Sequence, residues 1–229
     1  MCGRFVQAHR PEFYAEHFGV EVMKTPALAP SWNVAPTDEV YAVAEHSGER
    51  LLGTFRWGLL PWWAKDRKAA ARNINARSET AAEKPAFRDS FVSKRCLIPA
   101  DGFFEWEPKP KGKLPHFIHA VTDEPLALAG LWSSWRDPET DERVRTCTIL
   151  TGDPNDLVAK LHNRMPIILD RPAWNAWLDP STADREGLEE LLRHSAPPLA
   201  EHAVSTLVNK VANNVPECIA PLETGAVEA

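Results

Sequence analysis

Short apolar stretches alternate with polar, proline-rich connections along the chain, and their spacing predicts the secondary structure. Residues 11–19 combine a proline at the start with a glycine at the end, which is typical of a helix. Residues 40–44 and 51–57 are apolar runs on either side of Ser47-Gly48, a pattern that predicts a β-hairpin. By the same criteria we expect further strands at residues 95–98, 117–120, 126–131, 144–150, 167–169 and 204–208, and further helices at residues 155–161, 173–178 and 185–193.

The order of these elements indicates the fold class. Strands outnumber helices and do not alternate regularly with them, which argues against a doubly wound parallel sheet. We therefore expect an α+β fold with a mostly antiparallel, barrel-like β core and peripheral helices. No repeat and no linker rich in proline, glycine or serine divides the chain. We expect one domain over residues 1–222, followed by a frayed tail at residues 223–229.

The composition predicts a soluble globular protein. The chain has 229 residues, of which 44% are hydrophobic and 25% are charged, and a chain of this length can bury a sizeable core. Its apolar stretches are shorter than the roughly 18–20 residues that a membrane span needs. The first residues lack the charged and apolar regions of a signal peptide. We expect a cytoplasmic protein of bacterial type without a membrane anchor.

The net charge of −6 argues against a general nucleic-acid coating protein, but the charge is unevenly distributed. Residues 65–95 contain nine Lys or Arg and four Asp or Glu, so this segment carries +5 and the remainder carries −11. A local basic patch on an acidic protein can steer a polyanion to one place. A solvated surface of mixed charge is the alternative interpretation.

The four cysteines lie far apart in the sequence and form no C-x-x-C pair. This spacing predicts neither a zinc site nor a disulfide framework, and we expect no metal and no cofactor. Cys96 and Cys147 lie within predicted strands, where a free thiol packs as a small apolar side chain. The interesting cysteine is Cys2, because removal of Met1 would make it the first residue.

An N-terminal cysteine carries an amine and a thiol on adjacent carbons, with pKa values of about 8 and about 8.5. Two chemistries follow. The thiolate can act as a nucleophile with its own amine as base. Alternatively, the amine can condense with an aldehyde while the thiol closes a five-membered thiazolidine ring. With Met1 attached, the Cys2 nitrogen is an amide and neither the imine nor the thiazolidine can form. A cysteine also occurs at the second position by chance.

Three other stretches contain residue types suited to chemistry or binding. Trp62-Trp63 precedes Asn75 and Arg77 in the basic segment, and tryptophans beside arginines are typical of single-stranded nucleic-acid sites. Glu105 lies among aromatic residues, which would raise its pKa toward acid–base use. His162 follows a predicted helix and can transfer protons. The alternatives are core tryptophans, an outward-facing strand carboxylate and a capping or core histidine.

These stretches belong to motifs that follow one another along the chain: Met1-Cys2-Gly3-Arg4-Phe5, Trp32-Asn33-Val34-Ala35-Pro36, Trp62-Trp63, Asn75-Ala76-Arg77-Ser78-Glu79-Thr80, Asp101-Gly102-Phe103-Phe104-Glu105-Trp106, His162-Asn163-Arg164-Met165-Pro166 and Val211-Ala212-Asn213-Asn214-Val215. In this order they resemble the motifs of one protein family. The chain is similar to the SOS-response-associated peptidase (SRAP) family from residue 2 to about residue 222. This resemblance implies a protein that finds abasic sites in single-stranded DNA and cross-links to them covalently. The peptidase named in the family title would be a self-processing that exposes Cys2.

The resemblance also implies a role for each site residue. Cys2 would supply the amine and the sulfur of a thiazolidine formed with the C1′ aldehyde of the open-chain abasic sugar. Asn75 would orient the cysteine and the sugar, Glu105 would hold or deprotonate the amine, and His162 would assist ring opening and proton transfer. The DNA-binding residues would be Arg4, Asn33, Trp62, Trp63, Arg77 and Arg164.

The expected partner is single-stranded DNA with an abasic site, including a junction with duplex, and the resemblance suggests a monomer. Phosphate contacts and base stacking predict weak sequence preference and a salt-dependent encounter. Two other functions stay open at the level of sequence. One is a cysteine-dependent peptidase with Cys2 as nucleophile, and the other is a non-catalytic single-strand DNA-binding module.

Overall fold

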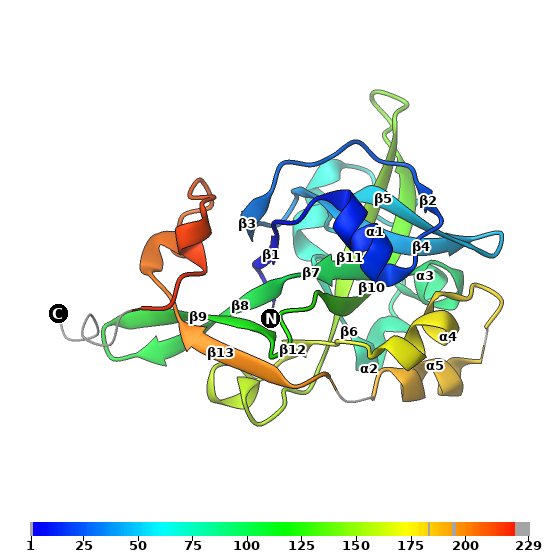
Figure 1. The fold of residues 1–229 in the computed structure, drawn as a ribbon. Coiled ribbons are helices and arrows are strands. Elements are labelled where there is room, and N and C mark those ends of the chain that lie inside the picture. Colours follow the sequence, from blue (N-terminus) through cyan, green and yellow to red (C-terminus); the bar gives the residue numbers. More distant parts are fainter. Residues whose placement is uncertain (1, 183, 194–195, 223–229) are drawn as a thin grey trace.

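A closed β-barrel forms the centre of the molecule (Figure 1). The computed structural model describes residues 2–182, 184–193 and 196–222. Neighbouring strands of the barrel are antiparallel, and a parallel pairing of β5 with β11 at Thr146↔Arg56 and Cys147↔Trp57 closes the ring. The predicted α+β fold with a mostly antiparallel, barrel-like core is therefore confirmed. The ring runs through β4 (Glu39–His46), β5 (Glu49–Trp57), β11 (Arg143–Gly152), β10 (Leu126–Arg136) and β7 (Arg95–Ala100).

Three short strands extend this sheet beyond the ring. β2 (Val22–Met23) and β6 (Asn75–Arg77) run parallel to β5 and β11, whereas β12 (Met165–Pro166) runs antiparallel to β11. β6 and β12 both pair with the C-terminal half of β11, with Thr151 opposite Arg77 on one side and Pro166 on the other. Segments that are about 90 residues apart in the sequence therefore meet at the end of β11.

A second, antiparallel sheet extends from the barrel and contains the start of the chain (Figure 1). β1 lies between β3 and β8, with Phe5 opposite both Val34 and Phe103, so the residues just before β1 lie between segments far along the chain. The order of the strands is β13 (Leu199–Ala203), β9 (Gly112–Ala120), β8 (Gly102–Lys109), β1 (Phe5–Gln7) and β3 (Ser31–Val34).

Helices cover one face of the barrel, and the alternation of side chains along the strands explains why. On β4, Tyr41 and Val43 belong to an apolar cluster with helical residues such as Phe18 and Trp177. The helices are α1 (Pro11–Phe18), α2 (Ser78–Ala81), α3 (Arg88–Ser93), α4 (Trp174–Leu178) and α5 (Arg185–Leu191). None of the helices in the described ranges is long and apolar enough to cross a membrane.

The other face of the barrel strands forms a second apolar cluster, and Cys2 belongs to it. Val40 and Ala42 alternate with the helix-facing residues of β4 and pack in this cluster. Cys96 and Cys147 lie there too and are fully buried, which confirms their prediction as buried strand thiols. The start of the chain is therefore anchored in the core.

Three predicted elements differ from the structure, and in two of them local polar contacts form a tighter turn. Residues 155–161 contain a single 3₁₀ turn, Val158–Lys160, because the Asn155 side chain accepts a hydrogen bond from the Val158 N–H. Residues 204–208 are not a strand, because Ser205 caps a 3₁₀ turn at Thr206–Asn209, and the strand comes earlier, as β13. At residues 167–169 only Ile168 forms an isolated bridge. The predicted tail at 223–229 lies outside the described residues.

Candidate active site

Cys2 lies directly before β1 and is completely buried. Its Sγ lies 3.7 Å from the Arg4 carbonyl oxygen, and β1 itself is held by a bond from the Asp101 N–H to the Val6 carbonyl. Burial raises the pKa of the Cys2 thiol far above its usual range, and the negative charge of Glu105 raises it further. The Cys2 sulfur is therefore a neutral thiol at neutral pH and not a free thiolate.

Asn75 connects a distant segment to the backbone of Cys2. It is the first residue of β6, where pairing with Ile149 of β11 fixes its position. Its side-chain Nδ2 donates a hydrogen bond of 2.7 Å to the Cys2 carbonyl oxygen. Its Oδ1 is buried and accepts no hydrogen bond from the residues that the structure describes. Asn75 thus orients Cys2 and keeps one acceptor available beside it.

Glu105 reaches the same region from β8. A Cβ on Gly102 would lie 2.4 Å from the Phe117 ring, so glycine is needed where β8 starts against β9. Three residues later, the Glu105 side chain lies almost fully buried, and this burial raises its pKa, against the opposing influence of the Lys113 ammonium. The raised pKa makes Glu105 a stronger base than an exposed carboxylate.

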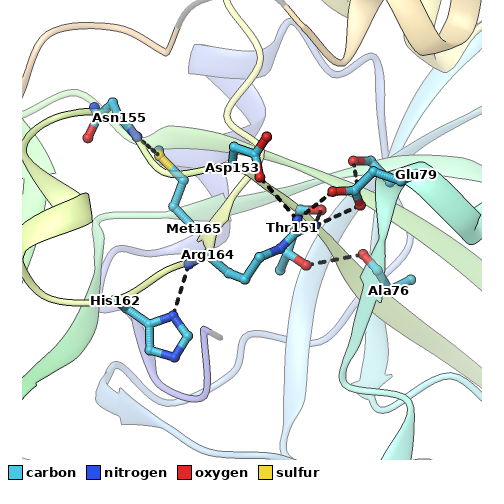
Figure 2. Close-up of polar contacts among 9 residues, drawn as sticks. Ala76, Glu79, Thr151, Asp153, Asn155, His162, Arg164 and Met165 are labelled. Atoms are coloured by element: carbon cyan, nitrogen blue, oxygen red, sulfur yellow. Dashed lines mark hydrogen bonds and ion pairs between the residues drawn. The ribbon is translucent and has the colours of Figure 1, made fainter.

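His162 is positioned by a turn in the chain after Val158–Lys160. Its N–H donates to the Val158 carbonyl, and its ring Nδ1 accepts a hydrogen bond of 3.0 Å from the Arg164 N–H (Figure 2). Burial lowers the pKa of His162, and the positive charge of Lys113 lowers it further. Because an N–H donor requires an unprotonated Nδ1, this hydrogen bond also favours the neutral ring.

A hollow of about 470 Å³ opens over Glu105 and His162. Its other walls are Trp106, Lys113 and Asn209, and the Trp106 indole donates a 2.8 Å hydrogen bond to the Asn209 Oδ1. We did not predict Lys113 or Asn209 from the sequence. Lys113 comes from β9, and Asn209 ends the 3₁₀ turn after β13, so only the strand pairing brings them here. No local motif marks either residue.

The two tryptophans predicted to bind DNA lie at the surface. Trp62 is 67% exposed and Trp63 is 49% exposed, on the loop that follows β5. The alternative that they are core residues is therefore wrong for both. Arg77, at the end of β6, is also exposed and forms no ion pair with any described residue. All three side chains can reach a ligand without unfolding.

The other three predicted DNA contacts are held by the protein itself. Arg4 donates to the Asn33 Oδ1 at 2.7 Å and to the Val208 carbonyl at 2.8 Å. Asn33 is buried, and its Nδ2 lies within hydrogen-bond distance of three carbonyls of the segment 208–213. The Arg164 guanidinium is paired with Glu79. A contact of these residues with DNA stays a prediction.

The basic segment 65–95 is only partly available to a ligand. Arg67 is paired with Asp137 and Glu142, and Arg95 is buried with its guanidinium directed at main-chain carbonyls. Burial lowers the pKa of Arg95 to about 10. The positive charge near the exposed tryptophans is therefore smaller than the sequence total suggests. Within the described ranges, no three His, Cys, Asp or Glu side chains gather in a way that could hold a metal ion.

The fold and the site define a class of protein, a small closed-barrel protein whose second residue is a buried cysteine. An asparagine bonds to its backbone, a glutamate acts on its thiol, and a histidine shares a hollow with that glutamate. The family model for the SOS response associated peptidase (SRAP) matches residues 1–211, and the chain belongs to this family.

Relatives and solved structures agree with this assignment. The chain is 41% identical to the abasic site processing protein YoqW of Bacillus subtilis, over 96% of this chain and 99% of that protein. It is 37% identical to the abasic site processing protein HMCES of Gallus gallus, over 78% of this chain and 60% of that protein. A crystal structure of a protein from Bacteroides thetaiotaomicron superimposes with a TM-score of 0.85 at 25% identity, covering 97% of this chain and all of that one.

Proposed function

We propose that this protein captures abasic sites in single-stranded DNA by forming a covalent thiazolidine between the C1′ aldehyde of the sugar and Cys2. The observation that carries the proposal is the convergence of Cys2, Asn75, Glu105 and His162 from four separate segments of the chain. The names of the relatives YoqW and HMCES, both abasic site processing proteins, support it.

The reaction begins once Met1 has been removed and the Cys2 nitrogen is a free amine. The amine adds to the aldehyde carbon, and loss of one water gives an imine. The Cys2 thiol then adds across the C=N bond, so that sulfur bonds to carbon and the thiol proton moves to nitrogen. The net change is the loss of one water. Because the fold keeps the thiol neutral, the amine attacks first and the sulfur closes the ring.

Each neighbouring side chain has a function in these steps. Glu105, with its raised pKa, takes the proton that the ammonium must lose before it attacks. His162, neutral at physiological pH, exchanges a proton with the sugar oxygens during ring opening and with the departing water. Asn75 holds the Cys2 carbonyl, which fixes the direction of the amine relative to the hollow.

In the proposed complex, exposed side chains outside the hollow hold the strand. Trp62 and Trp63 offer flat apolar faces on which bases stack, and Arg77 offers a guanidinium for a flanking phosphate. Stacked bases must be unpaired, so single strands and junctions with duplex are the preferred substrates. These contacts identify no base, and a monomer is sufficient to make them.

The competing function, a cysteine peptidase, is disfavoured by the state of the thiol. Catalytic cysteines are partly exposed and have a lowered pKa, because the thiolate is the nucleophile. Cys2 is fully buried and its pKa is raised. An imine formed by the amine needs no thiolate, so the observed environment suits thiazolidine formation better.

The test uses chain without Met1 and single-stranded DNA that carries one abasic site. We expect an adduct that survives denaturation, forms without a reducing agent and is absent with intact DNA. Cys2→Ala should abolish the adduct but keep non-covalent binding. An adduct of full yield with Cys2→Ala would refute the thiazolidine. Peptide turnover in the absence of DNA would favour the peptidase, and binding without any adduct would favour the non-catalytic module.

A further inference from the structure

Glu79 lies outside the group of residues just described, yet it contacts the segment that carries His162. It is the second residue of α2 and follows β6, which carries Asn75. Its carboxylate forms a two-pronged ion pair with the Arg164 guanidinium, with Oε2 accepting from Nη2 at 2.8 Å (Figure 2). These hydrogen bonds lower the pKa of Glu79 to about 2. The carboxylate therefore stays charged, and the pair stays formed, at physiological pH.

Arg164 is fixed by more than this pair. Its Nη2 also donates to the Thr151 carbonyl at 2.5 Å, at the end of β11, and only 12% of its side chain is exposed. Thr151 in turn donates to the Ala76 carbonyl of β6. Glu79, Arg164 and Thr151 thus join β6, β11 and the 162–165 segment into one network (Figure 2).

The network ends at the His162 ring. The Arg164 N–H donates to the His162 Nδ1 at 3.0 Å, so Nδ1 is the acceptor and the proton of the neutral imidazole resides on Nε2. The two residues are only two positions apart. The guanidinium is held by Glu79, by the Thr151 carbonyl and by a longer contact of 3.4 Å with the Asp153 carboxylate. It therefore fixes the backbone N–H that selects this tautomer and sets the direction of the ring.

We propose that Glu79 is a positioning residue for the cross-linking reaction, which holds Arg164 and thereby keeps His162 in its Nε2–H tautomer facing the hollow. This inference rests on the proposed function. It also gives Arg164 an internal role in addition to the phosphate contact predicted from the sequence, which stays a prediction. The two roles predict different effects, because a phosphate contact affects DNA affinity whereas a positioning contact affects the reaction rate.

The decisive variant is Glu79→Gln, which keeps the shape of the side chain and removes its charge. Glu83→Gln is the matched control, because Glu83 lies four residues further along and pairs with Arg185, also at the surface. Three quantities are measured for both variants: the single-turnover rate of adduct formation, the Kd for undamaged single-stranded DNA in a Cys2→Ala background, and the ¹⁵N signals of the His162 ring. If Glu79→Gln does not fold, Glu79→Asp, which retracts the charge by one methylene, replaces it.

We expect Glu79→Gln to slow adduct formation about ten- to a hundredfold, the cost of a small displacement of a catalytic group. The Kd should change less than twofold, and the ring ¹⁵N signals should move from one tautomer toward a mixture. Glu83→Gln should match the unaltered chain in all three measurements. An unchanged ring spectrum with a weakened Kd would overturn the inference in favour of a phosphate contact. Unchanged values throughout would also overturn it.

Failure of the proposed function can be separated from failure of this inference. If the unaltered chain forms no adduct at all, the proposed function is refuted. The ring ¹⁵N spectra of the chain and of Glu79→Gln still decide whether Glu79 sets the His162 tautomer, because they require neither DNA nor turnover. Identical spectra would refute the inference independently.

Discussion

Burial shifts the pKa values of Glu105 and His162, two of the side chains that line the hollow, in opposite directions. It raises the pKa of Glu105 and lowers the pKa of His162, so in both cases the uncharged form gains. A carboxylate of raised pKa accepts a proton more readily, and a neutral imidazole can donate one hydrogen bond and accept another. The environment of each residue, more than its chemical type, therefore determines its role in the reaction.

Glu105→Gln tests the proton acceptor. We expect adduct formation to slow about 100-fold, within the range that general base catalysis contributes, because the amide cannot take the proton of the amine. Affinity for undamaged single strands should stay close to that of the unaltered chain. Glu107→Gln is the control, since Glu107 lies two residues further on β8 and pairs with Lys109. An equal loss in rate and in affinity would indicate a structural role instead.

The pH dependence of adduct formation tests His162. Its pKa lies below the ordinary 6.5, so the ring stays neutral to lower pH than a free imidazole. The loss of rate due to its protonation should therefore appear only below pH 6.5, and this part of the profile should vanish in His162→Gln. The lowered pKa also affects stability. The unfolded chain binds this proton more readily than the folded chain does, so the free energy of unfolding decreases as the pH falls through that range. A loss of rate that already begins above pH 6.5, and that disappears in His162→Gln, would contradict the lowered pKa.

At the scale of elements, the first strands of the chain hold the loop that follows the last strand. Arg4 and Asn33 lie at β1 and β3, and their side chains occupy the carbonyls of Val208, Lys210 and Asn213. Asn209, a wall of the hollow, lies in this loop. Arg4 and Asn33, which we predicted as DNA contacts, thus hold the loop that forms one wall of the hollow.

Asn33→Ala should destabilise the protein by about 2–4 kcal/mol, because it leaves several buried polar groups without partners. For a chain of this size the melting temperature should fall by roughly 5–15 °C. Thermal unfolding followed by circular dichroism measures this. An unchanged melting temperature with weakened binding to single strands would show that Asn33 acts on DNA and not on the fold.

The loop after β5 should contribute to the affinity for single-stranded DNA but not to the stability of the folded protein. Replacing Trp62 and Trp63 together by Ala should weaken binding to single-stranded DNA by about 1–3 kcal/mol for each lost stacking partner. The melting temperature should hardly change, because both side chains are largely exposed. The buried Trp135 offers the contrast, since Trp135→Ala should unfold the protein readily. Unaltered affinity of the double variant would exclude a stacking surface on this loop.

Elements with strong local signals were predictable, and elements defined by distant partners were not. Pro11 and Gly19 mark α1, and Ser47-Gly48 marks the β4–β5 turn. β1 has only three residues, and β13 has no buried residue, so neither shows an alternation that a sequence reveals. Likewise residue types pointed to Cys2, Glu105 and His162 as candidates, and their roles and that of Asn75 came from a family resemblance. Lys113 and Asn209 join the hollow only through the tertiary fold.

Across the whole molecule, the distribution of charge limits where DNA can bind. The chain carries −6, so most of its surface repels a polyanion, and only part of the segment 65–95 opposes this. Arg95 was counted with that segment, yet it lies in the core, where its guanidinium holds carbonyls of α3 and α4. Under the proposed function, the exposed cations that remain in this segment, together with Trp62 and Trp63 just before it, are the expected contacts of a strand.

Salt should therefore weaken the non-covalent binding of DNA without affecting the covalent adduct. The Kd for single-stranded DNA should rise with salt concentration, with a slope in log–log form of about −0.7 per phosphate neutralised. A small slope is expected, because few free cations take part. The adduct, once formed, should persist at any salt concentration, as measured on denaturing gels. A salt-independent Kd would contradict an electrostatic encounter.

The hold of β1 and β3 on the loop at 208–213 also bears on synthesis of the protein. A ribosome makes Arg4 and Asn33 at the beginning and the carbonyls that satisfy them some 175 residues later. Until residue 213 has left the exit tunnel, the buried amide of Asn33 lacks its acceptors and the wall formed by Asn209 is missing. If the proposed function holds, a growing chain carries Cys2 beside an unfinished hollow, and it would gain the capacity to capture DNA only after residue 213 has emerged.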